Sequence, residues 1–322
     1  MSASLLRNLC FVILFAACAS ASRNARQPVE YDPIIDNNYD QPSIAAGLKP
    51  LSLMDLPQTQ DGGFVLAPGL YEAEFKTYCL QPGTPDPRPG DAYLQGPVTG
   101  YRKDIVESVL LNSRHHSQIP QKHVQLLLWS VVSGADFNKL SSSVQSDAMK
   151  LLTPRQVFEL KGGVAGVIKT VASSGIFKGN SGMQRLFEMG TTSYESFERI
   201  AVLREPSQIK KHGVKYDRWY KQSENYYIRY FPASYQKVKI QVYVPDSLLD
   251  AEHKLNGDYL VFDPTGQQAS PAFTNAQRLG IGAPVLEVIR VIIQVNKQKK
   301  ANTPPAKTPD QKRKSRPGQK QF

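Results

Sequence analysis

Cysteine is scarce in this chain, which has three cysteines in 322 residues. Cys10 and Cys18 lie near the N-terminus, and the third is Cys79. If the N-terminal segment is removed on export, no second thiol remains, and an internal disulfide is excluded. A chain of this length can bury a sizeable core without cross-links, so Cys79 needs another explanation.

Long apolar runs are also missing, since no stretch approaches the roughly 18 consecutive apolar residues that a transmembrane helix requires. A short apolar run extends from Leu9 to Ala17, with Arg7 before it and Ala19-Ser20-Ala21 after it. This pattern is typical of a signal peptide that is cut after Ala21. We therefore expect an exported, water-soluble protein that is periplasmic, displayed at the cell surface or secreted.

Phe15-Ala16-Ala17-Cys18 offers an alternative, because it resembles the lipobox at which bacterial lipoproteins are cut. Cys18 would then carry the lipid and anchor the protein. Phe15 stands where such boxes usually carry leucine, so the sequence favours cleavage after Ala21.

The net charge of +11 belongs mainly to the C-terminus, where residues 296–322 hold nine basic side chains and one acidic one. This segment has four prolines and no aromatic residue before Phe322, so it cannot bury enough surface to offset its ordering entropy. We expect a disordered basic tail. It serves either as a solvated extension or as a contact to a polyanion, such as an envelope surface, a polysaccharide or nucleic acid.

Common catalytic motifs are absent. The sequence has no Gly-Lys-Ser phosphate loop, no Gly-x-Ser-x-Gly elbow and no His-Glu-x-x-His helix, and it predicts no cofactor. His115, His116 and His123 are close in sequence but lack a cysteine pair or a clear carboxylate helper, so they make a weak metal-site candidate. Cys79 and His123 could form the nucleophile and base of a cysteine hydrolase, an alternative that rests on residue types alone.

The pattern along the chain predicts an α+β fold. The expected order is a signal peptide over 1–21, a linker over 22–63, an α+β domain over 64–215, a mainly β module over 216–296 and the tail over 297–322. The linker is poorly patterned and leads to the turn signal Asp61-Gly62-Gly63. The β module is either a second domain or a sheet layered under the helices, and the pattern does not decide between them.

Period-two alternation is strongest from Leu70 to Leu80, which predicts a half-buried strand. Cys79 falls on the apolar face of this strand, at its downstream end. Pairing must stop just beyond Cys79, because proline cannot donate to a sheet ladder and four prolines follow, at Pro82, Pro85, Pro87 and Pro89.

Two helices are predicted next, from Arg102 to Asn112 and from Pro120 to Ser133. On the second helix, Gln125 lies within the apolar stripe. A buried carboxamide must find partners or cost roughly a few kcal/mol. We therefore expect a group in the core to engage Gln125, with Gln121 as a second candidate.

Further elements are predicted along the rest of the chain. A capping box with proline at the first helical position marks a helix at Thr153-Pro154-Arg155-Gln156, and a helical run follows from Met183 to Leu203. Strands are expected at 226–231, 237–244, 258–262 and 285–295.

Part of the sequence resembles a known family, the thioester domains of bacterial surface adhesins. The resemblance covers residues 71–135 and rests on Tyr78-Cys79-Leu80, Gly90-Asp91-Ala92-Tyr93 and Val124-Gln125-Leu126-Leu127-Leu128-Trp129. In that family a Tyr-Cys motif precedes a Thr-Gln-x-Ala-Ile-Trp motif, and the Cys and Gln side chains join as an internal thioester. Val124 and Leu127 depart from this pattern, whereas the four-residue step from Gln to Trp is retained.

The resemblance implies a bond between Cys79 and Gln125, with Tyr78, Gln121 and Trp129 in support. The protein would then be an adhesin-like surface or envelope binding protein that attaches covalently to an unknown ligand, without enzymatic turnover. Other interpretations stay open. Cys79 is a small buried hydrophobe while Gln125 bonds a backbone edge, or the thiol pairs with another chain. The protein as a whole would then be a structural or assembly component of the envelope that docks through its basic tail.

Overall fold

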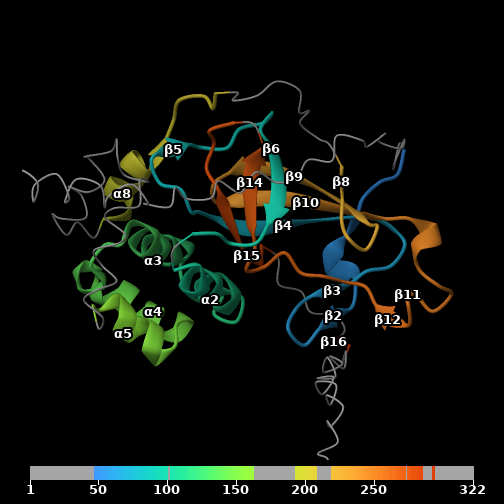
Figure 1. Ribbon diagram of the computed structural model, residues 1–322, viewed down its shortest axis with the longest axis horizontal. Coiled ribbons are helices and arrows are strands. Elements are labelled where there is room, and N and C mark those ends of the chain that lie inside the picture. Colours follow the sequence, from blue (N-terminus) through green and yellow to red (C-terminus); the bar gives the residue numbers. More distant parts are fainter. Residues whose placement is uncertain are drawn as a thin grey trace, which may run out of the picture.

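The computed structural model describes residues 47–100, 102–162, 193–208, 219–272, 274–285 and 292–293. The expected signal peptide, the lipobox, the basic tail and most of the linker lie outside these residues. The described part is an α+β fold in which the helices gather at one end of a large sheet and a small sheet lies at the other (Figure 1). No described helix has the length and apolar character needed to cross a membrane.

The large sheet is nearly closed. Its first and sixth strands in spatial order, β6 and β9, approach each other, and the Tyr230 hydroxyl donates to the Gln95 side chain across that gap. The order is β6 (Ala92–Gly96), β14 (Gln268–Ala272), β15 (Leu279–Pro284), β4 (Gly69–Cys79), β10 (Lys237–Val244), β9 (Tyr227–Ser234) and β8 (Tyr220–Lys221), with β1 (Leu51–Ser52) parallel to β4.

Strand β4 is the longest strand and the centre of the sheet. It confirms the strand predicted over 70–80, and its side chains alternate as expected: Phe75 and Cys79 are fully buried, whereas Glu74 is exposed. One edge of β4 pairs with β10 in an antiparallel ladder from Lys76 to Gly69. The other edge pairs first with β1 and then with β15.

The two helices predicted over 102–112 and 120–133 are present, and the structure shows further helices. The capping box at Thr153 is present, with its hydroxyl accepting from the Gln156 N–H, and Gly134 in the left-handed conformation ends the second predicted helix. The helices are α2 (Lys103–Ser113), α3 (Gln121–Ser133), α4 (Ser142–Leu151), α5 (Pro154–Leu160) and α8 (Tyr194–Ala201).

Short elements fill the remainder. The smaller sheets are β13 (Val261–Phe262), β3 (Phe64–Val65), β2 (Gln58–Thr59) and β16 (Ile292–Ile293); β5 (Thr84–Pro85) with β7 (Val202–Leu203); and β11 (Lys254–Leu255) with β12 (Asp258–Tyr259). The 3₁₀ turns of the described residues are η1 (Leu53–Asp55), η2 (Phe137–Lys139) and η4 (Asp246–Leu248).

Several predicted boundaries differ from the structure. Part of the expected linker is folded, because β1, η1 and β2 lie between residues 51 and 59 and Leu53 is fully buried. The strand expected over 258–262 is two strands that belong to different sheets. In the range 285–295, the described strand is Ile292–Ile293. The helical run expected from Met183 begins, within the described residues, only at Tyr194 and gives way to β7 at Val202.

The strands of the large sheet come from both predicted ranges, 64–215 and 216–296. β4 and β6 belong to the first range, and the other strands after β6 belong to the second. The C-terminal range is mainly β, as expected, and its strands interleave with β4 and β6. Strand β15 had no alternating signal because it carries two glycines. A Cβ on Gly280 would lie 2.9 Å from Leu110 of α2, and one on Gly282 would lie 2.7 Å from the Tyr78 ring.

Candidate functional site

The candidate site lies where β4 outruns its neighbour β10. The ladder between them reaches Lys237 opposite Lys76, and the Thr77 N–H then donates to the Gln236 carbonyl over 2.9 Å. Strand β10 begins at Lys237, so it has no residues opposite the last residues of β4 to pair with their backbone groups on that edge. A buried backbone group without a partner is costly, so another element must supply the hydrogen bonds.

Helix α3 supplies them through two side chains. The Gln125 carbonyl oxygen accepts from the Cys79 N–H over 2.8 Å, and its amide nitrogen donates to the Cys79 carbonyl over 3.0 Å. Gln121, one turn earlier, donates to the carbonyls of Thr77 (3.1 Å) and Gln236 (2.8 Å). A carboxamide carries the same donor and acceptor as a peptide group, so these two side chains continue the ladder in place of a strand.

The engagement expected for Gln125 is therefore confirmed. The two sequence-predicted residues, 46 positions apart, meet in the core: Cys79 is fully buried and Gln125 is 2 % exposed. The partner of the carboxamide is the backbone of Cys79 itself. This contact fixes the Gln125 carbonyl next to the residue that carries the thiol.

Cys79 forms no disulfide with another described residue, and as a thiol it is neutral at physiological pH. Burial raises its pKa to about 12, and the charge of Asp86 adds to this effect. The Trp129 indole and the Gln81 backbone act on this pKa in the opposite direction. A thiol in this state is protected from oxidation and alkylation, because the thiolate is the reactive form.

A stack of aromatic rings covers the site. Trp129 is fully buried. The centroid of its ring lies 5.7 Å from that of Tyr194 and 6.4 Å from that of Phe197, both on α8, and 6.3 Å from that of Tyr235. The Tyr194 and Tyr235 hydroxyls hydrogen-bond each other, and Tyr235 also donates to Glu198 over 2.9 Å. Trp129, predicted as a supporting residue, thus connects the Cys79 site with α8.

An acidic residue that the sequence reasoning did not single out lies beside the thiol. Asp86 accepts from the Tyr235 N–H over 2.9 Å and from Arg204 over 2.8 Å. Burial raises the pKa of this carboxyl, although the bonds from Tyr235 and Arg204 lower it in part. The run of prolines around Asp86 indicated only a loop, and the strand β5 within it, which pairs with β7, was not predicted.

Two other predicted residues are placed elsewhere. Tyr78 is buried but points to the opposite face from Cys79, as strand alternation requires, and its ring packs against Gly282. His123 hydrogen-bonds Asp147 of α4 over 2.8 Å, whereas Gln125, two residues later, faces β4. The structure therefore pairs Cys79 with Gln125 and not with His123.

The histidine cluster also has a different environment from a metal site. The His116 ring contacts the Gln118 side chain, and His123 shares Asp147 with Lys150. Within the described ranges, no three metal-ligating side chains lie together.

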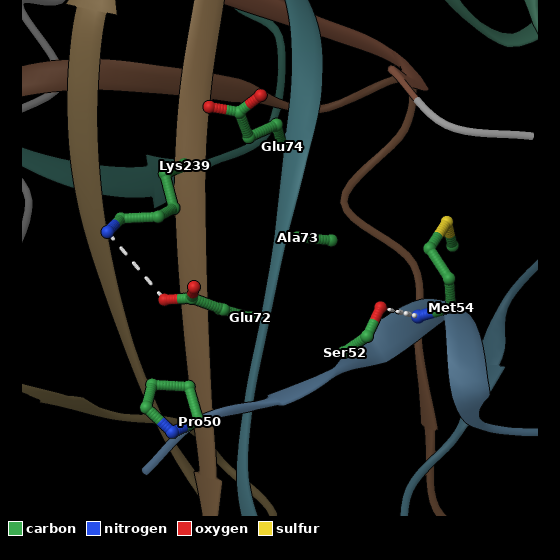
Figure 2. A pocket seen from close by; sticks show the side chains of 7 residues that line it. All are labelled: Pro50, Ser52, Met54, Glu72, Ala73, Glu74 and Lys239. Carbon is green, nitrogen blue, oxygen red and sulfur yellow. Dashed lines mark hydrogen bonds and ion pairs between the residues drawn. The ribbon is translucent and has the colours of Figure 1, made fainter.

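A separate hollow of about 390 Å³ lies beside β1 and β4, and Figure 2 shows its lining. Its carboxylates are already paired: Glu72 with Lys239 over 3.6 Å, and Glu74 with Lys237 over 3.0 Å. It is lined by residues 72–74 in the middle of β4, whereas Cys79 ends that strand. The hollow is therefore distinct from the Cys79 site.

Comparisons with known proteins identify no relative. No family model matches the chain, and no curated protein or solved structure matches it significantly.

Proposed function

We propose that this chain is an exported surface or envelope binding protein that attaches covalently to its ligand through an internal thioester between Cys79 and Gln125. The observation that carries the proposal is the double hydrogen bond between the Gln125 carboxamide and the Cys79 backbone. Both bonds hold the Gln125 carboxamide against the residue that carries the thiol, in a buried place. The resemblance of residues 71–135 to thioester domains of adhesins adds support.

The reaction balances without a cofactor. The Cys79 sulfur attacks the side-chain carbonyl carbon of Gln125, the bond from that carbon to the amide nitrogen breaks, and the thiol proton leaves with the nitrogen as ammonia. The Cys79 N–H, which bonds the Gln125 carbonyl oxygen, polarises the carbonyl and stabilises the negative charge that develops on it. The neutral thiol fits this scheme if its proton moves to nitrogen as the new bond forms.

The second half of the scheme is capture of the ligand. An amine or hydroxyl on the ligand attacks the thioester carbon, and the sulfur leaves as the thiol after it regains a proton. One bond is made per molecule, and no turnover follows. Burial among the rings of Trp129 and Tyr235 protects the thioester from water until then.

Capture of a small amine tests this function. The mature protein is incubated with methylamine and mapped by peptide mass spectrometry. We expect methylamine on Gln125 and a new alkylatable thiol at Cys79, with neither change in the Cys79→Ala variant. Absence of the label from Gln125, in protein whose fold is intact by circular dichroism, would contradict the proposal.

The same hydrogen bonds also support a second function, because they can have a purely structural role. Gln125 and Gln121 complete the β4 ladder without any covalent chemistry. We then infer a structural or assembly component of the envelope, which docks through its basic C-terminal segment. Deletion of residues 297–322 should release such a protein from envelope fractions at low salt, and unchanged association would contradict this alternative.

A further inference from the structure

Helix α8 and the residues after it cross the end of the sheet at which Cys79 lies. Residues 194–208, called the latch below, consist of α8, β7 and the residues that follow β7. Figure 1 shows α8 beside α3 and β5, at the end of the molecule where the helices gather. The buried face of α8 is narrow, because Phe197 and Ala201 are buried and its other residues are at least partly exposed.

The C-terminal end of α8 is bonded to segments that adjoin Cys79. The Ala201 carbonyl accepts from the Gly83 N–H over 2.8 Å, and Gly83 lies four residues after Cys79. The Gln277 amide donates to the same carbonyl over 3.4 Å. Gln277 lies two residues before Leu279, the ladder partner of Cys79. Helix α8 therefore ends beside the downstream end of β4.

The N-terminal end of α8 is bonded to the turn between β9 and β10. The Tyr194 ring stacks on Trp129 with the centroids 5.7 Å apart, and its hydroxyl accepts from the Gln236 amide over 3.0 Å. The Gln236 carbonyl accepts in turn from Gln121, which helps to complete the β4 ladder. The helix thus spans the gap that β10 leaves at the end of β4, and the candidate site lies in that gap.

Within the described residues, two buried polar atoms next to α8 lack a hydrogen bond, the Trp129 indole nitrogen and the Gln277 side-chain oxygen. Trp129 lies against the rings of Tyr194 and Phe197. Gln277 lies against the end of α8, where its amide donates to Ala201. A buried polar atom without a partner costs free energy that contact with water removes. Opening of the latch would hydrate both atoms, which makes the closed state less favourable relative to the open one.

The part of the latch beyond α8 is fastened at the protein surface. Arg204, whose side chain is 63 % exposed, bonds Asp86 over 2.8 Å and Glu198 over 2.9 Å. Strand β7 pairs with β5 over two residues, and Ser207 donates to Asp91. An exposed ion pair and a two-residue ladder each contribute little stability, so these bonds close the latch without fixing it permanently.

We propose that the latch is a gate, which covers the fully buried Cys79 and its partner Gln125 when closed and opens locally while the large sheet stays folded. Local opening breaks fewer contacts than global unfolding does, so it occurs at a lower cost in free energy. The amine or hydroxyl of the ligand then reaches the thioester only through the open state, a consequence that rests on the proposed function. Such a gate keeps water from a bond that is used once.

Labelling of the Cys79 thiol tests the gate without any thioester. The chain that begins at Ser22, in which Cys79 is the single cysteine, is made with Gln125→Ala so that the thiol stays free. Its reaction with iodoacetamide is followed by mass spectrometry at several urea concentrations below the unfolding transition. A local gate predicts a labelling rate that rises with urea much less steeply than global unfolding does. Labelling with the full urea dependence of global unfolding would overturn the inference.

Variants at the two ends of the latch assign the opening to it. In the same background, Arg204→Ala removes the ion pairs and should speed labelling about threefold to tenfold. Tyr194→Ala removes the ring from Trp129 and should speed it about tenfold to a hundredfold. Arg114→Ala is the matched control, because it breaks an ion pair with Asp263 (2.6 Å) outside the latch and should leave labelling at low urea unchanged. Arg204→Ala and Tyr194→Ala chains that react no faster than the Arg114→Ala chain would overturn the inference.

Methylamine capture separates the gate from the proposed function. In chains that keep Gln125, Arg204→Ala should raise the rate of methylamine incorporation by the same factor by which it speeds thiol labelling. Incorporation at equal rates in the parent and in Arg204→Ala overturns the gate and leaves the thioester intact. No incorporation in any folded chain, together with faster labelling of Cys79 in Arg204→Ala, contradicts the proposed function and supports the gate.

Discussion

The two faces of strand β4 satisfy their polar groups in opposite ways. On the outer face, Glu74 pairs with Lys237 between side chains that are 46 % and 42 % exposed. At the downstream end of the inner face, Gln125 binds the backbone of Cys79 in a place that water does not reach. Removing a partner outside leaves a group that water can solvate, whereas removing one inside leaves bare donors and acceptors.

This difference indicates where the stability of the fold depends on a single side chain. The outer face is a network: Gln241 accepts from Arg229 and donates to Glu72, and Lys239 also lies near Glu72. Each member has more than one neighbour, so one loss is shared. The inner end relies on one carboxamide for both backbone groups of Cys79. We therefore expect stability to be far more sensitive there.

The largest effect is expected for Gln125→Ala. It leaves the buried N–H and carbonyl of Cys79 unpaired, which should lower the free energy of unfolding by about 2–5 kcal/mol in urea denaturation. The measurement is made in a Cys79→Ala background, so that loss of a thioester does not contribute. A change below about 1 kcal/mol would show that the carboxamide does not complete the ladder.

Alkaline pH should lower the free energy of unfolding because the buried Cys79 thiol favours its neutral form. This effect should be somewhat smaller than that of Gln125→Ala. Folding raises the pKa of Cys79 from 9.0 to about 12, so the thiol's contribution to stability is full below pH 9 and is lost as the pH rises toward 12. The free energy of unfolding should fall by up to about 1.4 kcal/mol per pH unit in this window.

The control for this prediction separates Cys79 from the buried tyrosines, which also titrate at high pH. Unfolding of Gln125→Ala, which keeps a free thiol, is compared with unfolding of the Cys79→Ala/Gln125→Ala double variant at each pH. The thiol-containing chain should lose stability more steeply above pH 9. Parallel curves would mean that Cys79 is not buried as a neutral thiol.

Gln121→Ala provides an intermediate case at the same strand end. Gln121 is only partly buried, and water can replace its bond to the Gln236 carbonyl. We expect a loss of about 0.5–1.5 kcal/mol, clearly below that of Gln125→Ala. Equal losses for the two variants would erase the distinction between a buried and an accessible carboxamide.

The smallest effect is expected on the outer face. Lys237→Ala removes one exposed ion pair and should change the free energy of unfolding by less than about 0.5 kcal/mol. The variant is measured at low and at high salt, and the small difference from the parent should shrink further at high salt. A loss comparable to that of Gln125→Ala would break the comparison between the two faces.

Residues whose burial follows from a local period could be predicted from the sequence. Alternation placed Cys79 on the buried face at the end of its strand, and the helical period placed Gln125 in an apolar stripe. A buried carboxamide demands partners, so the existence of a contact could also be predicted. Its partner could not, because no local pattern shows that β10 begins at Lys237 and leaves the end of β4 unpaired.

The cover of the site escaped prediction for the same reason. Asp86, Glu198 and Tyr235 come together across more than a hundred residues, and each alone appears as an ordinary polar or aromatic residue. Strand β15 was hidden because Gly280 and Gly282 are dictated by the close packing of Leu110 and Tyr78, not by alternation. Local periods reveal which side chains are buried, whereas long-range pairing decides what they meet.

Intact-mass spectrometry of the chain that begins at Ser22 tests the central proposal most directly. A thioester between Cys79 and Gln125 predicts a mass lower than that of the sequence by one ammonia, with the full mass restored in both Cys79→Ala and Gln125→Ala. A full-mass parent protein, whose single thiol reacts stoichiometrically with an alkylating reagent after unfolding, would contradict it.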